Sequence, residues 1–425
     1  MLTLKIIRQQ TEEVIERLKI KGHDAEQNIK EIISLDDNRR KVQTTLDETN
    51  SKLNNIAKEV GMLFKEGKIE LANEAKAMTV TLKEEAKSLE EKMSELEGEI
   101  TKRLLQIPNL PHESVPKGKS DKDNKVEKNA FFDVKLPKDA LPHWELASKY
   151  NLIDFELGNK LAGAGFPVYK GLGARLQRAL ITFFLDNNID AGYNEIMPPI
   201  VANEASAYGT GQLPDKEGQM YYIGEDNLYM IPTAEVPITN VYRDTIVSES
   251  DLPIKMTAYT PCFRREAGSY GKDVRGLNRL HQFDKVEIVQ IVKPETSYAT
   301  LDDMVAHVER IVNKLELPYR ILRLCGGDIS FTSALTFDFE VYSAGQDRWL
   351  EVSSVSNFES FQANRLKLRY KSADGKTKEL AHTLNGSSLA LPRILAAILE
   401  NNQTPEGIRV PKALVPYMNG IEIIK

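Results

Sequence analysis

The chain has 425 residues, of which 41% are hydrophobic and 28% charged, so it has the composition of a globular protein with room for two or three domains. Its net charge of -6 argues against a nucleic-acid-binding surface over the whole molecule, but leaves room for a local basic stripe. Two cysteines and the absence of a long apolar run exclude a disulfide framework, zinc-ligand cysteine spacing and a transmembrane helix. We therefore expect a cytoplasmic protein that binds neither zinc nor a membrane.

Two long stretches with heptad-like spacing follow a short amphipathic segment at residues 1–20. Apolar side chains recur three and four positions apart over residues 32–63, and a second seam covers residues 75–100. A KEGK turn separates the two seams, so the pattern predicts an antiparallel helical hairpin with a coiled-coil seam as its core. About 40 residues at roughly 1.5 Å each would project about 60 Å, which suits reach rather than catalysis.

The surface of this hairpin carries interleaved lysine and glutamate residues, which favour a solvated coiled coil or an oligomerisation arm. A proline-rich and charged stretch follows it and predicts a linker. We therefore divide the chain into an N-terminal helical hairpin (1–105), a linker (106–130) and a mixed helical and strand-like region (131–425).

The mixed region begins with helical segments. His143 and Trp144 precede the first of them, where we expect a lone histidine to make a structural contact rather than to act as a catalyst. An apolar helix at residues 174–185 leads to a strand-like segment that ends at Pro198 and Pro199. Further along, TAE (233–235) lies where a strand-like segment meets a helix, and its threonine could cap that helix.

Residues 259–289 have the pattern of two strands around a long polar loop. The stretch contains cations and an aromatic ring that suit a nucleotide: Arg264, Arg265, Lys272, Arg275, Arg279 and Phe283. Guanidinium groups match phosphate oxygens in pairs, and an aromatic ring can stack on a base. A charged hairpin exposed to solvent is the alternative interpretation.

Two later segments carry polar residues of the same interest. In EVSS (351–354), a carboxylate and a hydroxyl on one strand could hold Mg²⁺, or could be an ordinary surface pair. Further along, Asn385, Gly386 and Ser387 are expected to turn the chain into an apolar helix. Arg393 lies near the start of that helix, where an arginine is costly unless it meets an anion.

Together these segments resemble those of seryl-tRNA synthetases, which are class II aminoacyl-tRNA synthetases. FRREAGSYGKDVRGLNRLHQFDKVE is similar to their motif 2, TAE to their serine-binding segment and EVSS to an ATP-binding segment. HTLNGSSLALPRIL is similar to motif 3, although Ser388 stands where many relatives have glycine, and the helix, strand and prolines before residue 200 resemble motif 1. The N-terminal hairpin resembles the family's tRNA-binding arm. The order of these segments is more specific than any one of them.

The resemblance implies an α+β fold, in which an antiparallel sheet flanked by helices forms a class II catalytic core preceded by an antiparallel coiled-coil hairpin. It implies activation of L-serine by ATP to seryl-adenylate, and transfer of serine to the 3′ end of tRNA(Ser), and of tRNA(Sec) where present. The implied partners are serine, ATP with Mg²⁺, tRNA on the arm and a second copy of the chain in a homodimer.

The resemblance also implies roles for individual residues. Arg264 and Arg393 would be catalytic as phosphate clamps. The implied ATP-binding residues are Arg264, Arg265, Glu266, Phe283, Glu351, Val352, Ser353, Ser354 and Arg393, with Glu351 and Ser354 as Mg²⁺ ligands. The implied serine-binding residues are Thr233, Ala234, Glu235, Glu287, Asn385 and Ser387. Lys272 and Arg275 would contact ATP first and the tRNA acceptor end later.

Two other functions stay open. A related enzyme could activate a small amino acid and load it onto a carrier protein, but such relatives lack the arm. A non-enzymatic tRNA-binding protein with a decayed core would be expected to lack Arg264, Glu266 or Arg393, and all three are present. A threonyl- or prolyl-type synthetase fits the hairpin and the TAE triplet less well.

Overall fold

The computed structural model describes residues 1–215, 217–266 and 275–425, which form two units. One unit comprises Leu2–Lys19 and His23–Pro108, and the other comprises Met1, Ile20–Gly22 and Asn109–Lys425. No helix among the described residues is both long enough and apolar enough to span a lipid bilayer.

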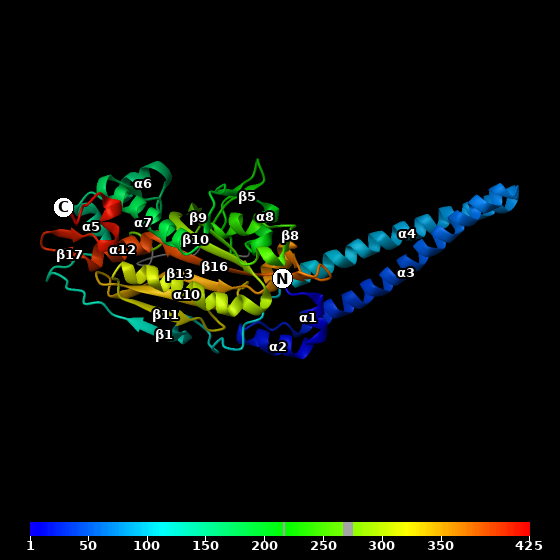
Figure 1. Ribbon diagram of the computed structural model, residues 1–425, viewed down its shortest axis with the longest axis horizontal. Helices are drawn as coiled ribbons and strands as arrows, with labels where there is room; N and C mark the ends of the chain where they lie inside the picture. Colours follow the sequence, from blue (N-terminus) through cyan, green and yellow to red (C-terminus); the bar gives the residue numbers. More distant parts are fainter. Residues whose placement is uncertain (216, 267–274) are drawn as a thin grey trace. The chain divides into compact units, whose positions relative to one another are not determined.

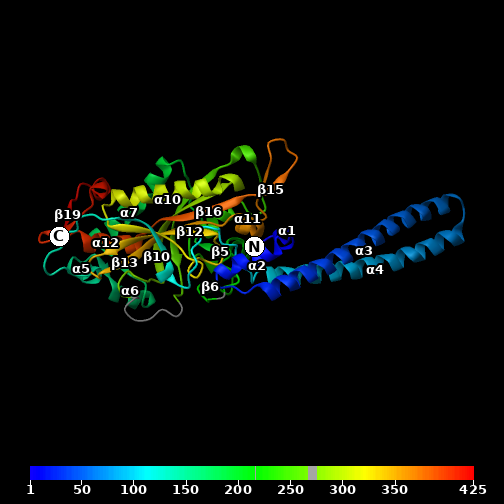
Figure 2. The ribbon, with the colours of Figure 1, turned by 90° about the horizontal axis from the view of Figure 1, so that it is seen from below.

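The first unit is built on two long helices, α3 (Glu26–Lys65) and α4 (Ile69–Leu104), which run side by side as a hairpin (Figure 1 and Figure 2). Short helices α1 (Leu4–Gln9) and α2 (Thr11–Ile20) precede them. The seam between the long helices buries apolar side chains at helical spacing, among them Ile32, Val42, Leu46, Ala86, Met93 and Ile100. The heptad pattern therefore corresponds to a real interface, and the expected helical hairpin is confirmed.

A cluster of charges fixes the base of the hairpin. Asp36 of α3 is fully buried, and its carboxylate accepts ion pairs from Arg8 at 3.0 Å, Arg39 at 2.8 Å and Arg40 at 2.9 Å. A buried carboxylate is tolerated only when it is paired in this way. The contact to Arg8 ties α1 to α3, while Arg39 and Arg40 brace the carboxylate from the next turn of α3 itself.

The second unit is organised around an eight-stranded sheet. Its strands, in spatial order, are β1 (Lys125–Ala130), β11 (Tyr319–Arg323), β12 (Leu335–Ser343), β13 (Arg348–Asn357), β16 (His382–Ala390), β10 (Gln282–Val292), β9 (Ile254–Phe263) and β4 (Asn194–Glu195). Neighbouring strands are antiparallel except for β4 and β9, which are parallel. The expected α+β class is therefore confirmed.

Helices and four small sheets surround this sheet. The helices are α5 (His143–Lys149), α6 (Phe155–Ala162), α7 (Gly171–Asp190), α8 (Glu204–Thr210), α9 (Glu235–Asn240), α10 (Ser297–Lys314), α11 (Ser360–Leu366) and α12 (Leu391–Asn401). The small sheets pair β2 (Ile153–Asp154) with β3 (Val168–Tyr169), β5 (Val201–Asn203) and β6 (Tyr222–Ile223) with β7 (Leu228–Met230), β8 (Ile246–Ser248) and β15 (Lys378–Leu380) with β14 (Arg369–Lys371), and β17 (Gln403–Thr404) and β19 (Ile423–Ile424) with β18 (Gly407–Arg409).

Alternation along the strands separates an apolar face from a polar one. In β12, Phe337 and Phe339 join the main core, to which α7, α10 and α12 also contribute side chains. Thr336, which precedes them, points to the other face, where its hydroxyl lies 2.9 Å from that of Ser356 on β13. Because side chains alternate along a strand, the face opposite the main core can carry polar side chains at this part of the sheet.

One expected turn is absent from the fold. Asn385, Gly386 and Ser387 lie inside β16, paired with Val289, Ile288 and Glu287 of β10, and the helix begins only at Leu391. Asn-Gly-Ser favours a turn locally, but both neighbouring strands supply partners for this backbone. A Cβ on Gly386 would lie 3.1 Å from Val355 of β13, so glycine also permits a close approach of these strands.

Candidate active site

Two adjoining cavities open on the polar face of the large sheet. One, of about 270 Å³, is called here the arginine cavity because Arg264, Arg279 and Arg393 line it. The other, of about 450 Å³, is called the acidic cavity because Glu217, Glu235, Glu266 and Glu287 line it. Residues common to both linings are Arg264, Glu266, Arg279, Lys285, Ser354 and Ser387. A ligand in one cavity would therefore meet a ligand in the other.

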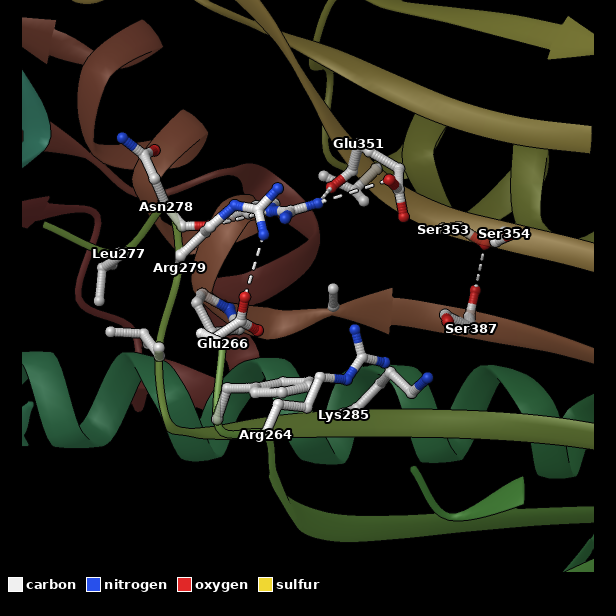
Figure 3. Close-up of a pocket in the computed structure, with 16 residues that line it drawn as sticks. Arg264, Glu266, Leu277, Asn278, Arg279, Lys285, Glu351, Ser353, Ser354 and Ser387 are labelled. Carbon is white, nitrogen blue, oxygen red and sulfur yellow. Dashed lines mark hydrogen bonds and ion pairs between the residues drawn. The ribbon is translucent and has the colours of Figure 1, made fainter. Parts of the chain in front are cut away.

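Three guanidinium groups line the arginine cavity, and Figure 3 labels two of the residues that carry them, Arg264 and Arg279. Arg393, near the start of α12, donates from Nη1 to the Glu351 carbonyl at 2.7 Å and from Nε to the Asn278 carbonyl at 3.2 Å. Arg279 pairs with Glu266 at 3.0 Å. Because guanidinium groups stay charged and bind oxygen pairs, such a cavity suits an anion with several phosphoryl groups.

Arg264 directly follows β9, and its guanidinium lies over an aromatic ring. Its guanidinium carbon lies 5.2 Å from the ring centroid of Phe283 on the adjacent strand β10. Cys262 is the direct cross-strand partner of Phe283, so Arg264 lies near the same end of the ladder. Glu266, two residues after Arg264, has a backbone φ of +48°. Strained conformations of this kind cluster at functional sites.

A pair of buried carboxylates characterises the acidic cavity. Glu287 of β10 is 2% exposed, and its Oε2 accepts from Thr233 at 3.2 Å and from Lys285 at 2.8 Å. Glu235 begins α9, is 8% exposed and accepts from Gln362 at 2.6 Å. Burial, and then the charge of Glu287, raise the pKa of Glu235 to about 7. The pair would favour a small ligand with a positive charge and hydrogen-bond donors.

Strand β16 supplies the remaining polar groups. Asn385 and Ser387 line the acidic cavity, and the Ser387 carbonyl accepts from the Ser353 hydroxyl at 2.6 Å. Thr233 was expected to cap a helix. Its hydroxyl accepts a hydrogen bond from the backbone amide of Glu235, the first residue of α9, at 3.3 Å. Strand pairing and the start of α9 thus bring together residues that lie 150 positions apart.

The structure gathers most of the residues singled out in the sequence. The arginine cavity collects Arg264, Glu266, Phe283, Glu351, Val352, Ser353, Ser354 and Arg393, and the acidic cavity collects Thr233, Glu235, Glu287, Asn385 and Ser387. Two others lie outside both linings: Ala234 packs in an apolar cluster, and the Arg265 guanidinium lies 5.8 Å from the Tyr221 ring. Arg275 lies over the Trp144 ring, and Lys272 is outside the described residues.

Two cations of the site were given no individual role from the sequence, although Arg279 was noted among the loop cations. Lys285 and Arg279 line both cavities, and each pairs with a carboxylate of the site. The sequence pattern could have identified Lys285, because it lies two positions from both Phe283 and Glu287 and must share their face of the strand. Arg279 follows a loop, where no periodicity predicts the direction of a side chain.

Oxygen groups beside the arginine cavity suit a hard cation. Glu351 and Ser354 lie on β13, and Asp338 is the cross-strand partner of Ser354. Asp338 is 8% exposed, and within the described part of the chain its Oδ1 has no hydrogen-bond partner. The described residues contain no group of three or more metal-ligating His, Cys, Asp or Glu side chains. The oxygens of Glu351, Ser354 and Asp338 fit Mg²⁺, because this ion uses one or two carboxylates and takes its other oxygens from phosphates and water.

Two family models match the chain. Residues 1–111 match the seryl-tRNA synthetase N-terminal domain, and residues 221–402 match the tRNA synthetase class II core domain (G, H, P, S and T). The serine–tRNA ligase of Salinibacter ruber is 50% identical over 418 residues, which are 98% of each chain. That of Akkermansia muciniphila is 47% identical over 424 residues, 98% of this chain and 97% of the relative.

Solved structures agree with these matches. Seryl-tRNA synthetase from Pyrococcus horikoshii, complexed with ATP, superposes with a TM-score of 0.91 and 32% identity over 100% of this chain and 99% of that one. Prolyl-tRNA synthetase of Giardia lamblia reaches a TM-score of 0.57 at 16% identity over 65% of this chain and 56% of its own, a likeness of fold alone. Both units thus have counterparts in one family, and the chain belongs to the seryl-tRNA synthetases, within the class II aminoacyl-tRNA synthetases.

Proposed function

We propose that the chain is a serine–tRNA ligase that activates L-serine with ATP and transfers it to the 3′ end of tRNA(Ser), and of tRNA(Sec) where that is present. The observation that carries this proposal is the junction of the two cavities. An arginine-lined cavity opens directly into one with two buried carboxylates, and both are lined by Lys285, Arg264 and Ser387. A nucleotide phosphate and the carboxylate of a small amino acid would meet at that junction.

On the nucleotide side, the three arginines would divide the phosphates among them. Arg264 and Arg393 act as clamps, while Glu266 orients the nucleotide end and Phe283 offers its ring to adenine. The guanidinium of Arg264 lies 5.2 Å from the centroid of that ring, so the cation that would hold a phosphate lies next to the ring that would stack on the base. Charge develops on phosphoryl oxygens during activation, so fixed cations accelerate the step.

Glu351 and Ser354 are the residues that would hold Mg²⁺ beside the phosphates. Bound there, the cation would neutralise charge on the departing pyrophosphate. Their placement on one strand lining the arginine cavity, opposite Asp338, supports this assignment.

On the amino-acid side, Glu287 would accept a hydrogen bond from the serine hydroxyl, with Thr233 and Ser387 around it. The ammonium group would face the two carboxylates, Glu235 and Glu287, with Asn385 beside them. Alanine lacks the hydroxyl and would leave a buried acceptor unpaired, which discriminates by several kcal/mol.

Two steps follow from this placement. A carboxylate oxygen of serine attacks the α-phosphorus, the bond from that phosphorus to the bridging oxygen breaks, and pyrophosphate leaves with the electron pair. The terminal ribose hydroxyl of the tRNA then attacks the activated carbonyl, and AMP leaves. The protein contributes mainly position and charge, because both reactants are bound with their reacting atoms adjacent.

The hairpin would bind the tRNA, and two copies of the chain would pair through the motif 1 segment. Phosphate contacts from the arm's lysines would position an A-form helix by its shape. Exposed apolar side chains support the dimer: Met197, next to Pro198, is 89% exposed, and Ile189, near the end of α7, is 43% exposed. A cytoplasmic location follows from the partners.

Amino-acid-dependent ATP–pyrophosphate exchange, measured with all twenty amino acids and no tRNA, tests the proposal. We expect exchange with serine alone, followed by charging of tRNA(Ser) when it is added. Exchange with threonine or proline instead would assign a different substrate. A folded protein that binds ATP but supports no exchange would point to a non-catalytic tRNA-binding role.

A further inference from the structure

A buried polar network lies behind the arginine cavity and includes a histidine and a glutamate far apart in the chain. His143 begins α5 and Glu400 lies near the end of α12, and both side chains are fully buried. Glu400 Oε1 lies 2.7 Å from Nδ1 of His143 and accepts from the His143 backbone amide at 2.9 Å. Neither residue is part of the lining of the arginine cavity or of the acidic cavity, so neither would touch a ligand bound in them.

The other ring nitrogen of His143 reaches the loop that follows Glu266. Leu277 donates its backbone N–H to Nε2 of His143 at 2.8 Å. This bond requires a lone pair on Nε2, and the carboxylate on the opposite side requires a proton on Nδ1. Burial alone would raise the pKa of Glu400, but hydrogen bonds from His143 and Ser343 bring it below the ordinary value, so the carboxylate is an acceptor.

A second branch of the network reaches the next residue of the same loop. Gln346 donates from Nε2 to Glu400 Oε1 at 3.2 Å, and its Oε1 accepts from the Asn278 side chain at 2.9 Å. The Asn278 carbonyl in turn accepts from Arg393 Nε at 3.2 Å. Two consecutive loop residues, Leu277 and Asn278, are therefore held from behind, and Arg279 follows them into the cavity.

The start of this segment is fitted closely against the same histidine. Gly276 has a φ of +65°, and a Cβ placed there would lie 2.2 Å from Nε2 of His143. Arg275 stacks over Trp144, the neighbour of His143, with its guanidinium carbon 4.5 Å from the ring centroid. Residues 275–278 thus contact α5 or its partners one after another.

We propose that His143, with Gln346 beside it, is a positioning residue for ATP, because it holds residues 277–279 in the geometry that presents Asn278 and Arg279 to the arginine cavity. The proposal rests on the function proposed above. If the histidine–glutamate pair were purely structural, replacing His143 would lower the stability of the fold. It would not change the protection of the Leu277 amide more than that of other amides in the core. The two roles can be told apart by experiment, because Nδ1 of His143 contacts Glu400 and Nε2 contacts the Leu277 amide, so each contact can be removed without the other.

Two substitutions of His143 divide its contacts. In His143→Asn, the amide nitrogen occupies the place of Nδ1 and can still donate to Glu400, but nothing reaches Leu277. In His143→Gln, the longer side chain places an acceptor near Nε2 and keeps the bond from the Leu277 amide. Gln346→Met removes the second branch and leaves the bonds of His143 to Glu400 and Leu277 in place, so it can be used if the Asn variant does not fold.

The first readout is the kinetics of serine-dependent ATP–pyrophosphate exchange. For His143→Asn we expect the KM for ATP to rise about tenfold, the factor that corresponds to about 1.4 kcal/mol and to one buried hydrogen bond. The KM for serine should stay within about twofold, and His143→Gln should keep the KM for ATP within about threefold of the unchanged protein. Gln346→Met should raise it by roughly threefold.

The second readout needs no substrate. Hydrogen exchange of the Leu277 amide in the ligand-free protein should become faster in His143→Asn and remain slow in His143→Gln. Equal loss of thermal stability in both histidine variants, with unchanged ATP affinity and equal amide protection, would overturn the proposal, as would an unchanged KM for ATP in Gln346→Met. If the unchanged protein showed no serine-dependent exchange, the proposed function would fail, while amide protection and the calorimetric Kd for ATP would still decide the role of His143.

Discussion

At the scale of single residues, Glu287 is the group on which amino-acid selection should depend most. Its carboxylate is almost fully buried and already accepts from Thr233 and Lys285, so a substrate donor would complete a desolvated site. We expect Glu287→Ala to lower kcat/KM for serine by about 100-fold or more, because a buried acceptor for the hydroxyl is lost. ATP affinity, measured by calorimetry, should change by less than about threefold.

The exposed Glu225, in the turn between β6 and β7, provides a matched control for this change. Glu225→Ala removes an acidic side chain from the same unit, and should leave both the serine and ATP constants unchanged. Unaltered serine dependence in the Glu287 variant would remove this residue from the amino-acid site.

Glu235 predicts how stability depends on pH. Its pKa, raised to about 7 by burial and by the charge of Glu287, exceeds the ordinary value of 4.5. The folded protein keeps this proton to a higher pH than the unfolded chain does, so the residue's contribution to the free energy of unfolding falls between about pH 4.5 and 7. Glu235→Gln does not titrate, so relative to the unchanged protein it should gain about 2–3 kcal/mol across this window.

Urea unfolding of both proteins at pH 5 and at pH 7.5, without ligands, measures this difference. Parallel pH profiles for the two proteins would show that Glu235 titrates normally and that the carboxylate pair is better solvated than its burial implies.

At the scale of elements, the turn that ends the loop after Glu266 should be more sensitive than other turns of similar backbone. Gly276 and Gly192 both have positive φ, +65° and +85°, but a Cβ on Gly276 would collide with His143 while one on Gly192 would meet nothing within 4 Å. Alanine is strained at both positions by about 1 kcal/mol. Only Gly276→Ala must also displace residues 277–279.

We therefore expect Gly192→Ala to lower the melting temperature slightly with an unchanged KM for ATP, and Gly276→Ala to raise that KM more than tenfold. Thermal unfolding and exchange kinetics on the same preparations measure both effects. An equal change of KM in the two variants would show that backbone strain, and not the contact with His143, is responsible.

Elements with strong periodicity were predictable and irregular ones were not. The heptads predicted the hairpin of α3 and α4, and the strand-like patterns at residues 259–289 and 351–354 placed several site residues on or next to β9, β10 and β13. The stretch from Asn385 to Ser387 was expected to turn, yet it lies within β16, because pairing with two strands outweighs local preference. Arg279 was noted as a loop cation but given no individual role, since the direction of its side chain depends on the contacts of Leu277 and Asn278.

At the scale of the whole molecule, long-range contacts set the limit of what the sequence could predict. His143 was expected to make a structural contact, but its partner Glu400 is 257 positions away and no local pattern connects them. The site could be assembled before the fold was known because the resemblance supplied the spatial grouping of motifs. The network behind the site has no such motif, and only the folded chain brings it together.

The division into two units predicts that the two chemical steps can be separated. Residues lining the two cavities all lie between 212 and 393, in the second unit, whereas the hairpin belongs to the first. Deleting residues 24–105, with a short flexible linker in their place, should leave serine-dependent exchange within about threefold and reduce tRNA(Ser) charging by about 100-fold or more. Residues 20–22 are kept because Lys21 donates to the carbonyls of Ser330 at 2.8 Å and Ser333 at 2.7 Å.

A shortened arm that lacks residues 50–84 refines this test. It keeps the buried Asp36 and the lower seam around Val42 and Leu46, so the base of the hairpin retains its core. If the outer half makes the phosphate contacts, the shortened arm should charge tRNA as poorly as the full deletion, and the charging activity of the intact protein should fall steeply with salt. Normal charging by the shortened arm would confine RNA binding to the base, and equal survival of both steps in the full deletion would give the hairpin a role other than holding tRNA.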